Sequence, residues 1–141
     1  DLKYFSPKVS LRYTGKENYF EYASRAVEFM ARREAEFDGE KMVRGCIVRH
    51  LILPLNVRDS EALIDWFAQK NFPAYFSLMS QYTPCGEIGD LPELQRRVTR
   101  REYEKVLSHL LATGMERVFT QGYGSADEKF IPDFSEGKEL F

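Results

Sequence analysis

The run CIVRHLILP, residues 46–54, places an arginine and a histidine inside an otherwise apolar segment of strand-forming residues. A charged group is costly to bury in a strand unless another group pairs with it. Because side chains alternate along a strand, Arg49 and Leu51 are expected on one face and His50 on the other. Two interpretations of Arg49 are open: an ion pair with a structural acid, or a contact to an anionic ligand. His50 is interpreted as a packed or solvent-facing residue.

Further polar residues occur near the ends of other strand-like runs. In DLKYF, residues 1–5, the acid and the lysine alternate and therefore share one side of a sheet. If the sheet curves, these groups meet in one cavity, and a cationic cluster with one acid is suited to a ligand carrying a carboxylate or a phosphate. The residues that could line this cavity are Asp1, Lys3, Arg49, Gln81 or Tyr82, and Gln121.

The composition indicates a globular protein. Of the 141 residues, 43% are hydrophobic, which is enough for the core of a single domain over residues 1–141. A net charge of -2 provides no basic surface for nucleic acid or an anionic membrane. The two cysteines, Cys46 and Cys85, cannot form a cysteine-rich metal site, and a cytoplasmic location is expected. Because the chain starts at Asp1 without a methionine, it is interpreted as a piece of a longer protein.

Strand-like runs alternate with amphipathic segments along the chain. Helices are expected over residues 18–33, after a cap at Asp59 or Ser60, and after the capping box of Thr99 and Glu102. This alternation predicts an α/β fold with a parallel sheet covered by helices, in which ligands bind at the carboxyl ends of the strands. Strands are expected at residues 1–5, 42–54, 74–82 and 116–121, and residues 122–141 are expected to form an irregular tail.

The segments DLKYF, VRHLILPLNVRDS, LMSQYTPCG, LQRRVTRREYEKV and FIPDF extend over nearly all of the chain. Together they resemble radical S-adenosylmethionine proteins of the pyruvate formate-lyase-activating-enzyme-like group. The resemblance implies the C-terminal part of a partial (β/α)6 barrel of the TIM type. It also implies reductive cleavage of S-adenosylmethionine by a [4Fe-4S] cluster. The resulting 5′-deoxyadenosyl radical abstracts a hydrogen atom, which in activating enzymes comes from a glycine of a partner glycyl radical enzyme.

The resemblance also implies roles for individual residues. Asp1 and Lys3 match a motif at the S-adenosylmethionine site, where the aspartate can also contact a monovalent cation. Arg49 matches an arginine of the cofactor-binding strand, with Leu51 near the adenine, so that His50 would face the helix layer or a polar pocket there. Tyr82 occupies the position at which the activating enzymes have a histidine, so the contact to the cofactor at this position is altered. The cofactor is therefore expected to contact Asp1, Lys3, Arg49, Leu51, Gln81 and Tyr82.

One departure from the family pattern limits the activity expected of this chain. The three cluster-binding cysteines of the C-x-x-x-C-x-x-C loop are absent, so the chain alone is expected to hold no cluster and to contain no catalytic residue. Two alternatives are open. One is a non-catalytic binding or assembly module that dimerises through an exposed sheet edge. The other is a Schiff-base lyase with Lys3 as nucleophile, which Asp1 disfavours by stabilising the charged amine.

Overall fold

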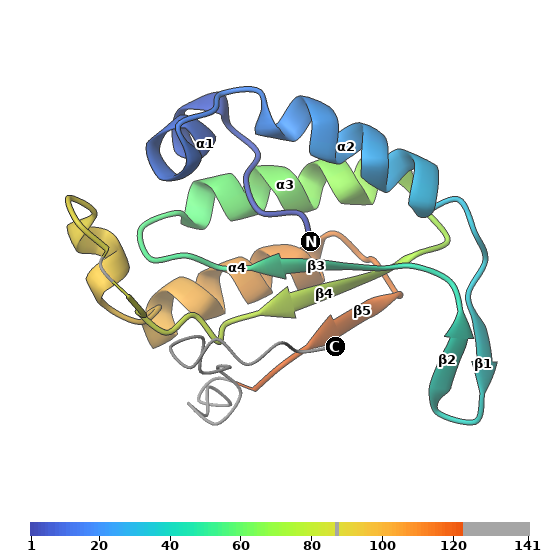
Figure 1. Ribbon diagram of the computed structural model, residues 1–141. Coiled ribbons are helices and arrows are strands. Elements are labelled where there is room, and N and C mark those ends of the chain that lie inside the picture. Colours follow the sequence, from blue (N-terminus) through green and yellow to red (C-terminus); the bar gives the residue numbers. More distant parts are fainter. Residues whose placement is uncertain (87, 123–141) are drawn as a thin grey trace, which may run out of the picture.

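Three parallel strands form the centre of the protein in a computed structural model that describes residues 1–86 and 88–122 (Figure 1). The strands β3 (Ile47–Leu51), β4 (Tyr75–Met79) and β5 (Val118–Thr120) pair in that order. Helix α3 (Val57–Lys70) connects β3 to β4, and α4 (Arg100–Ala112) precedes β5. The predicted α/β fold with a parallel sheet and covering helices is confirmed. The described residues form no closed barrel.

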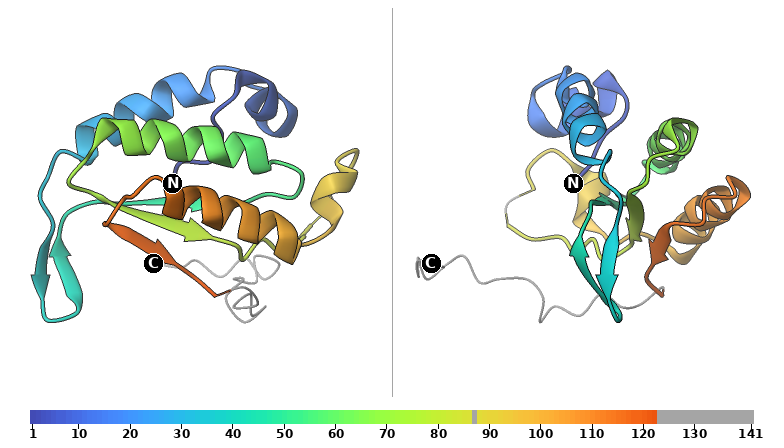
Figure 2. Two further views of the ribbon diagram at one scale, coloured as in Figure 1. Left: turned by 180° about the vertical axis from the view of Figure 1, so that it is seen from behind. Right: turned by 90° about the vertical axis from the view of Figure 1, so that its right-hand side faces the viewer.

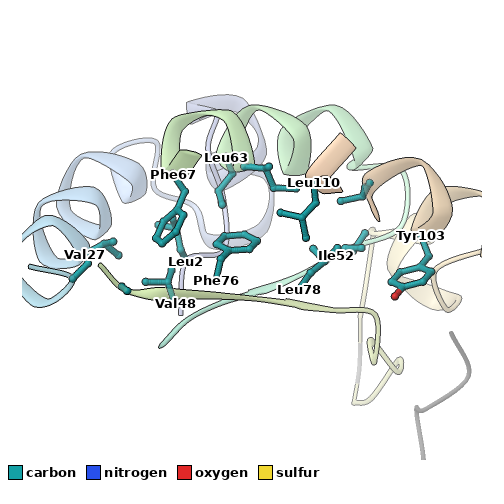
Figure 3. Close-up of a cluster of buried hydrophobic side chains, with 14 of the residues drawn as sticks. Leu2, Val27, Val48, Ile52, Leu63, Phe67, Phe76, Leu78, Tyr103 and Leu110 are labelled. Atoms are coloured by element: carbon teal, nitrogen blue, oxygen red, sulfur yellow. The ribbon is translucent and has the colours of Figure 1, made fainter. Parts of the chain in front are cut away.

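The hydrophobic core lies between this sheet and the helices α3 and α4, which lie on the same side of it (Figure 2). Alternate side chains of β3 and β4 point into the core, and those of Phe76 and Leu78 are fully buried (Figure 3). Burying a large apolar side chain of this kind contributes about 1.5–3 kcal/mol. The core residues from the two helices are Leu63, Ile64, Phe67, Tyr103, Val106 and Leu110.

Two helices precede the sheet along the chain. Helix α2 (Tyr19–Met30) lies within the predicted range 18–33, and the ring of its Phe20 contacts that of Trp66 on α3 at 5.2 Å between centroids. Helix α1 (Pro7–Thr14) was not predicted. It begins with a helix-start signal, because the Ser6 hydroxyl accepts a hydrogen bond from the Val9 amide and a proline occupies the first turn.

The predicted strand 42–54 is two strands that belong to different sheets. Strands β1 (Glu36–Asp38) and β2 (Lys41–Arg44) form an antiparallel hairpin, and only β3 joins the central sheet (Figure 1). The chain turns at Gly45, whose φ is +130°. A Cβ there would lie 3.0 Å from the Ala35 Cα. Glycine is required here because other residues rarely adopt this φ. The same φ lies outside the strand region, so the chain does not continue as one strand through residue 45.

The prediction of a first strand at residues 1–5 is wrong, although the segment runs beside β3. One backbone hydrogen bond joins it to that strand, from the Leu2 amide to the Arg49 carbonyl at 2.8 Å. The Lys3 amide instead donates to the Tyr19 hydroxyl at 2.9 Å. The Phe5 amide donates to the Asp59 carboxylate at 2.9 Å. Side chains therefore accept the hydrogen bonds of these backbone amides, as a neighbouring strand would in a ladder.

Helix α3 begins at Val57 after Asn56, two residues before the first predicted cap. Asp59 therefore lies in the first helical turn, and its carboxylate binds the N-terminal segment rather than the helix backbone. Ser60 is also inside the helix, where its hydroxyl contacts His50. The prediction was wrong because both side chains serve contacts that are distant in the sequence.

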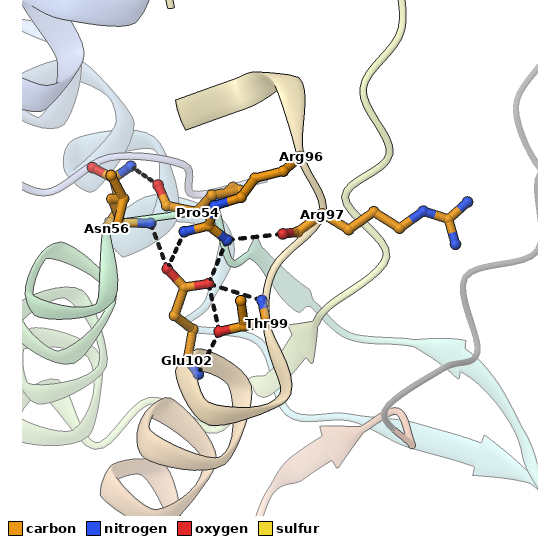
Figure 4. Close-up of polar contacts among 7 residues, drawn as sticks. Pro54, Asn56, Arg96, Arg97, Thr99 and Glu102 are labelled. Carbon is orange, nitrogen blue, oxygen red and sulfur yellow. Dashed lines mark hydrogen bonds and ion pairs between the residues drawn. The ribbon is translucent and has the colours of Figure 1, made fainter. Parts of the chain in front are cut away.

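Helix α4 starts at the predicted capping box of Thr99 and Glu102, which is confirmed. The Glu102 carboxylate also accepts two hydrogen bonds from the Arg96 guanidinium and one from the Leu55 amide, the guanidinium bonds at 2.9 Å and the amide bond at 2.8 Å (Figure 4). The Arg96 hydrogen bonds, and then those from the Thr99 and Leu55 amides, lower the pKa of Glu102 to about 2. One carboxylate thus joins the loop after β3 to the start of α4.

Candidate functional site

A pocket of about 240 Å³ lies at the carboxyl ends of β3 and β4, and we refer to it as the strand-end pocket. It is the kind of place where ligands bind in parallel α/β folds. Five of the six predicted cofactor-binding residues line it, and Gln81 does not. The lining residues are Asp1, Lys3, Tyr4, Arg49, Leu51, Leu53, Met79 and Tyr82.

Arg49 and Asp1 form an ion pair across this pocket. The Arg49 Nε lies 2.7 Å from the Asp1 Oδ1, and the two side chains are 57% and 41% exposed. An ion pair this exposed contributes only about 0–1 kcal/mol to stability, so the fold does not depend on it. Arg49 therefore has an acidic partner, while its side chain stays more than half exposed; the contact to an anionic ligand stays a prediction.

The other walls of the pocket are apolar and aromatic. Leu51, Leu53 and Met79 supply aliphatic surface next to the charged pair. The Tyr82 hydroxyl donates to the Leu94 carbonyl at 2.8 Å, so its proton is already engaged. Burial raises the pKa of Tyr82, as it does that of Tyr4. The pocket thus combines charged groups with flat, uncharged surfaces.

Tyr4 lines the pocket although alternation along the sequence did not predict it. In a regular strand Tyr4 would point away from Lys3, but both line the pocket, because residues 1–5 are extended without forming a strand. The Tyr4 ring packs against Tyr13 of α1 at 5.8 Å and against Tyr19 of α2 at 5.2 Å between centroids. The unpredicted helix α1 therefore helps to place a wall of the pocket.

His50 faces the helix layer, as expected for a packed histidine next to Arg49. Its side chain is 2% exposed. Its Nδ1 lies 2.8 Å from the Leu2 carbonyl oxygen, and its Nε2 lies 2.8 Å from the Ser60 hydroxyl. Burial lowers the pKa of His50, so the ring is neutral at pH 7.

The remaining candidate residues lie away from the pocket. Gln81 and Gln121 are not among its lining residues, and the Gln121 carbonyl accepts a hydrogen bond from the Tyr103 hydroxyl. Cys46 is half-buried, and burial raises the pKa of its thiol, whereas Cys85 is exposed. The predicted tail from 122 and the FIPDF segment lie outside the described residues, except for Gly122.

The residues of this chain do not fit a [4Fe-4S] cluster. Such a cluster with an open iron position needs three cysteine ligands, and the chain contains two cysteines. Within residues 1–86 and 88–122, no three His, Cys, Asp or Glu side chains gather as a metal site. The strand-end pocket instead combines charged walls with apolar walls, a composition typical of sites for organic ligands.

Comparisons with known proteins do not identify a family. No protein-family model, curated protein or solved structure matches the chain. In the part of the chain that the structure describes, each helix is too short or too polar to cross a lipid bilayer. The case for a function therefore depends on the chemistry and geometry of the strand-end pocket.

Proposed function

We propose that this chain forms the S-adenosylmethionine-binding part of a radical enzyme that resembles pyruvate formate-lyase activating enzymes. The observation that supports this proposal is the gathering of Asp1, Lys3 and Arg49, from two separate segments, around one pocket at the strand ends. In this proposal, β3, β4 and β5 belong to a partial (β/α)6 barrel whose interior faces the pocket. The parallel order of these strands is compatible with such a barrel.

Each wall of the pocket has a chemical role in this proposal. Lys3 and Arg49 bind the carboxylate of the ligand, and Asp1 accepts from its amino group or contacts a monovalent cation. Leu51 and Met79 pack against the adenosine, next to the ring of Tyr82. Gln81 has no role in the pocket as described.

In radical enzymes of this group, bound S-adenosylmethionine supplies the 5′-deoxyadenosyl radical that abstracts a hydrogen atom. The cysteines that bind the cluster come from outside these 141 residues in this proposal. A glycine of a glycyl radical enzyme is the hydrogen donor by analogy with the activating enzymes. What the present residues do is bind and orient the ligand and exclude water from it.

Calorimetric titration with S-adenosylmethionine tests the proposal. Arg49→Met is expected to weaken binding by at least tenfold, or about 1.4 kcal/mol, because it removes a charged hydrogen-bond donor. Arg25→Met is the matched control, since Arg25 forms an exposed ion pair with Glu21 outside the pocket. Absence of binding to the unmodified protein at millimolar ligand, or equal binding by both variants, would overturn the proposal.

The lyase alternative uses the same pocket and is separated by a different experiment. Lys3 lines the pocket, where a carbonyl substrate could reach its amine. Asp1 lines it too, so the lysine does not lie in the apolar, desolvated kind of pocket that activates a lysine nucleophile. Treatment with borohydride and small carbonyl compounds is expected to give no covalent adduct. An adduct that is lost in Lys3→Arg would favour the lyase.

Assembly through a sheet edge is a second candidate that one observation favours. Among the described strands only β4 pairs with β5, and Phe119 of β5 is 42% exposed. An open edge with an exposed aromatic side chain can pair with another chain. Light scattering over a range of concentrations tests this, and a dimer that Phe119→Lys dissociates would support it.

A further inference from the structure

Residues 1–6, the N-terminal segment, carry two charged residues of the strand-end pocket and are held by side chains of the core. Besides the single ladder bond from Leu2 and the contacts of Asp1 and Lys3 with the Tyr19 hydroxyl, the segment is bound at two further points. At one point the His50 ring meets the Leu2 carbonyl at 2.8 Å. At the other, the Asp59 carboxylate accepts from the Phe5 amide at 2.9 Å and the Ser6 amide at 2.8 Å.

The contacts of His50 determine where its proton lies. A carbonyl oxygen can only accept, so Nδ1 must carry the hydrogen that is donated to Leu2. In a neutral ring Nε2 is then an acceptor, and the Ser60 hydroxyl donates to it. Both Ser60 and His50 are buried, with 1% and 2% of their surface exposed, so water cannot replace either bond. Ser60 on α3 therefore fixes the orientation of the imidazole ring.

The position of the Leu2 carbonyl connects this buried contact to the pocket. Leu2 lies between Asp1 and Lys3 in the chain, and its side chain is fully buried in the core. The Leu2 amide also donates to the carbonyl of Arg49, whose guanidinium pairs with Asp1. Fixing both polar groups of Leu2 therefore fixes the backbone from which the two charged side chains extend.

We propose that His50 is a positioning residue of the strand-end pocket, which holds Asp1 and Lys3 opposite Arg49 through its hydrogen bond to Leu2. The adjacent residues Arg49 and His50 then serve one site from opposite faces of β3. Arg49 is accessible to the ligand, and His50 positions Asp1 and Lys3 from the buried face of the strand. The effect on ligand affinity rests on the proposed function, whereas the effect on the N-terminal segment does not.

Two substitutions of His50 separate positioning from general packing. The amide of asparagine lies near the place of Nδ1 and can donate to Leu2, whereas glutamine extends its amide toward the place of Nε2 and Ser60. His50→Asn therefore keeps the contact to the N-terminal segment, and His50→Gln keeps the contact to α3. Ser60→Ala is a control that removes only the hydroxyl that orients the ring.

Hydrogen exchange of the amides of residues 2–6, followed by NMR, is the first measurement. Exchange is expected to be at least tenfold faster in His50→Gln than in His50→Asn, because only glutamine leaves the Leu2 carbonyl without its donor; this corresponds to about 1.4 kcal/mol. S-adenosylmethionine is expected to bind more weakly to His50→Gln by a similar factor. Urea unfolding of the two variants should give closely similar midpoints.

The outcomes separate this inference from the proposed function. Equal exchange and equal affinity in the two variants would overturn the positioning role. A clear difference in exchange without any binding of S-adenosylmethionine to the unmodified protein would support the positioning role and overturn the proposed ligand. If the variants do not fold, nitrogen NMR of His50 in the unmodified protein decides. A proton on Nδ1 supports the inference, and a proton on Nε2 or on both nitrogens at pH 7 overturns it.

Discussion

The two faces of the central sheet differ in what they contact, and β3 shows the difference within four residues. On the face that α3 and α4 cover, Val48 and His50 are buried. On the opposite face Ile47 and Arg49 are exposed, and Arg49 forms an ion pair with Asp1. The covered face stabilises the fold, and the open face exposes charged and apolar side chains.

The difference shows how one strand can serve both purposes without conflict. If Arg49 lay on the covered face, its guanidinium would lose its hydration. If His50 lay on the open face, its ring would lose its packing contacts. Because side chains alternate, neighbouring residues face separate environments. Substitutions on the two faces should therefore have separable effects on stability and on binding.

The largest difference between the faces is expected for two adjacent aromatic residues of β4. Phe76→Ala should lower the free energy of unfolding by about 3–5 kcal/mol, because the fully buried ring leaves a cavity. Tyr75→Ala should cost about 1 kcal/mol, since Tyr75 stacks on Phe119 at the open face. Urea unfolding measures both. Equal losses would show that the open face is covered in solution.

A smaller loss is expected where a helix is held over the covered face. Glu102→Gln should lower the free energy of unfolding at pH 7 by about 1–3 kcal/mol, because Arg96 and two backbone amides lose a charged acceptor. Glu104→Gln, which breaks an exposed ion pair with Arg100 on the same helix, should change it by less than about 0.5 kcal/mol.

The effect of Glu102 should also depend on pH. Its pKa in the folded protein is about 2, below the ordinary value of 4.5, so its stabilisation is complete above pH 4.5 and is lost as the pH falls toward 2. The difference in stability between the unmodified protein and Glu102→Gln should shrink over that range. A difference that stays constant down to pH 2 would contradict the assigned charge interaction.

The buried histidine should give the covered face a pH dependence of its own. The pKa of His50 is lowered from 6.5, mainly by burial, against the opposing effects of the Leu2 carbonyl and the Asp59 charge. The unfolded chain therefore binds the proton first, and stability should fall as the pH drops below 6.5. The free energy of unfolding, measured from pH 8 to 5, should show this loss of stability in Arg49→Met. The loss should be absent in His50→Asn.

Only a small effect on stability is expected at the open face. Arg49→Met should change the free energy of unfolding by less than about 1 kcal/mol, because its ion pair with Asp1 is exposed to solvent. The same substitution is expected to have the largest effect on ligand binding. A loss above about 2 kcal/mol would show that Arg49 is a structural residue, as in a buried ion pair.

Alternation along the chain was sufficient to predict the central sheet and its covering helices. It failed where one residue controls the path, as at Gly45, which divides the predicted strand 42–54. Gly39 begins the two-residue loop between Asp38 and Lys41, and this glycine is the sequence signal that indicates the hairpin of β1 and β2. Helix α1 has only eight residues, too few to show a clear helical period in the sequence.

The strand-end pocket could be predicted in part. Arg49 and Leu51 lie in a regular strand, so their shared direction follows from the sequence. Gln81 follows the end of β4, where the chain is no longer a strand and alternation does not apply. The contacts of Asp59 and Ser60 join parts of the chain that only tertiary packing brings together.

The contact between Glu102 and Leu55 has a consequence for the order of folding. It joins two residues that are 47 positions apart, so the chain between them must close a long loop before the first turn of α4 is complete. Leu55 also has a φ of +62°, which is unfavourable for leucine, and the hydrogen bond of its amide to Glu102 helps to hold that conformation. The start of α4 is therefore expected to form late, after the sheet, so that Glu102→Gln accelerates unfolding and leaves the folding rate nearly unchanged.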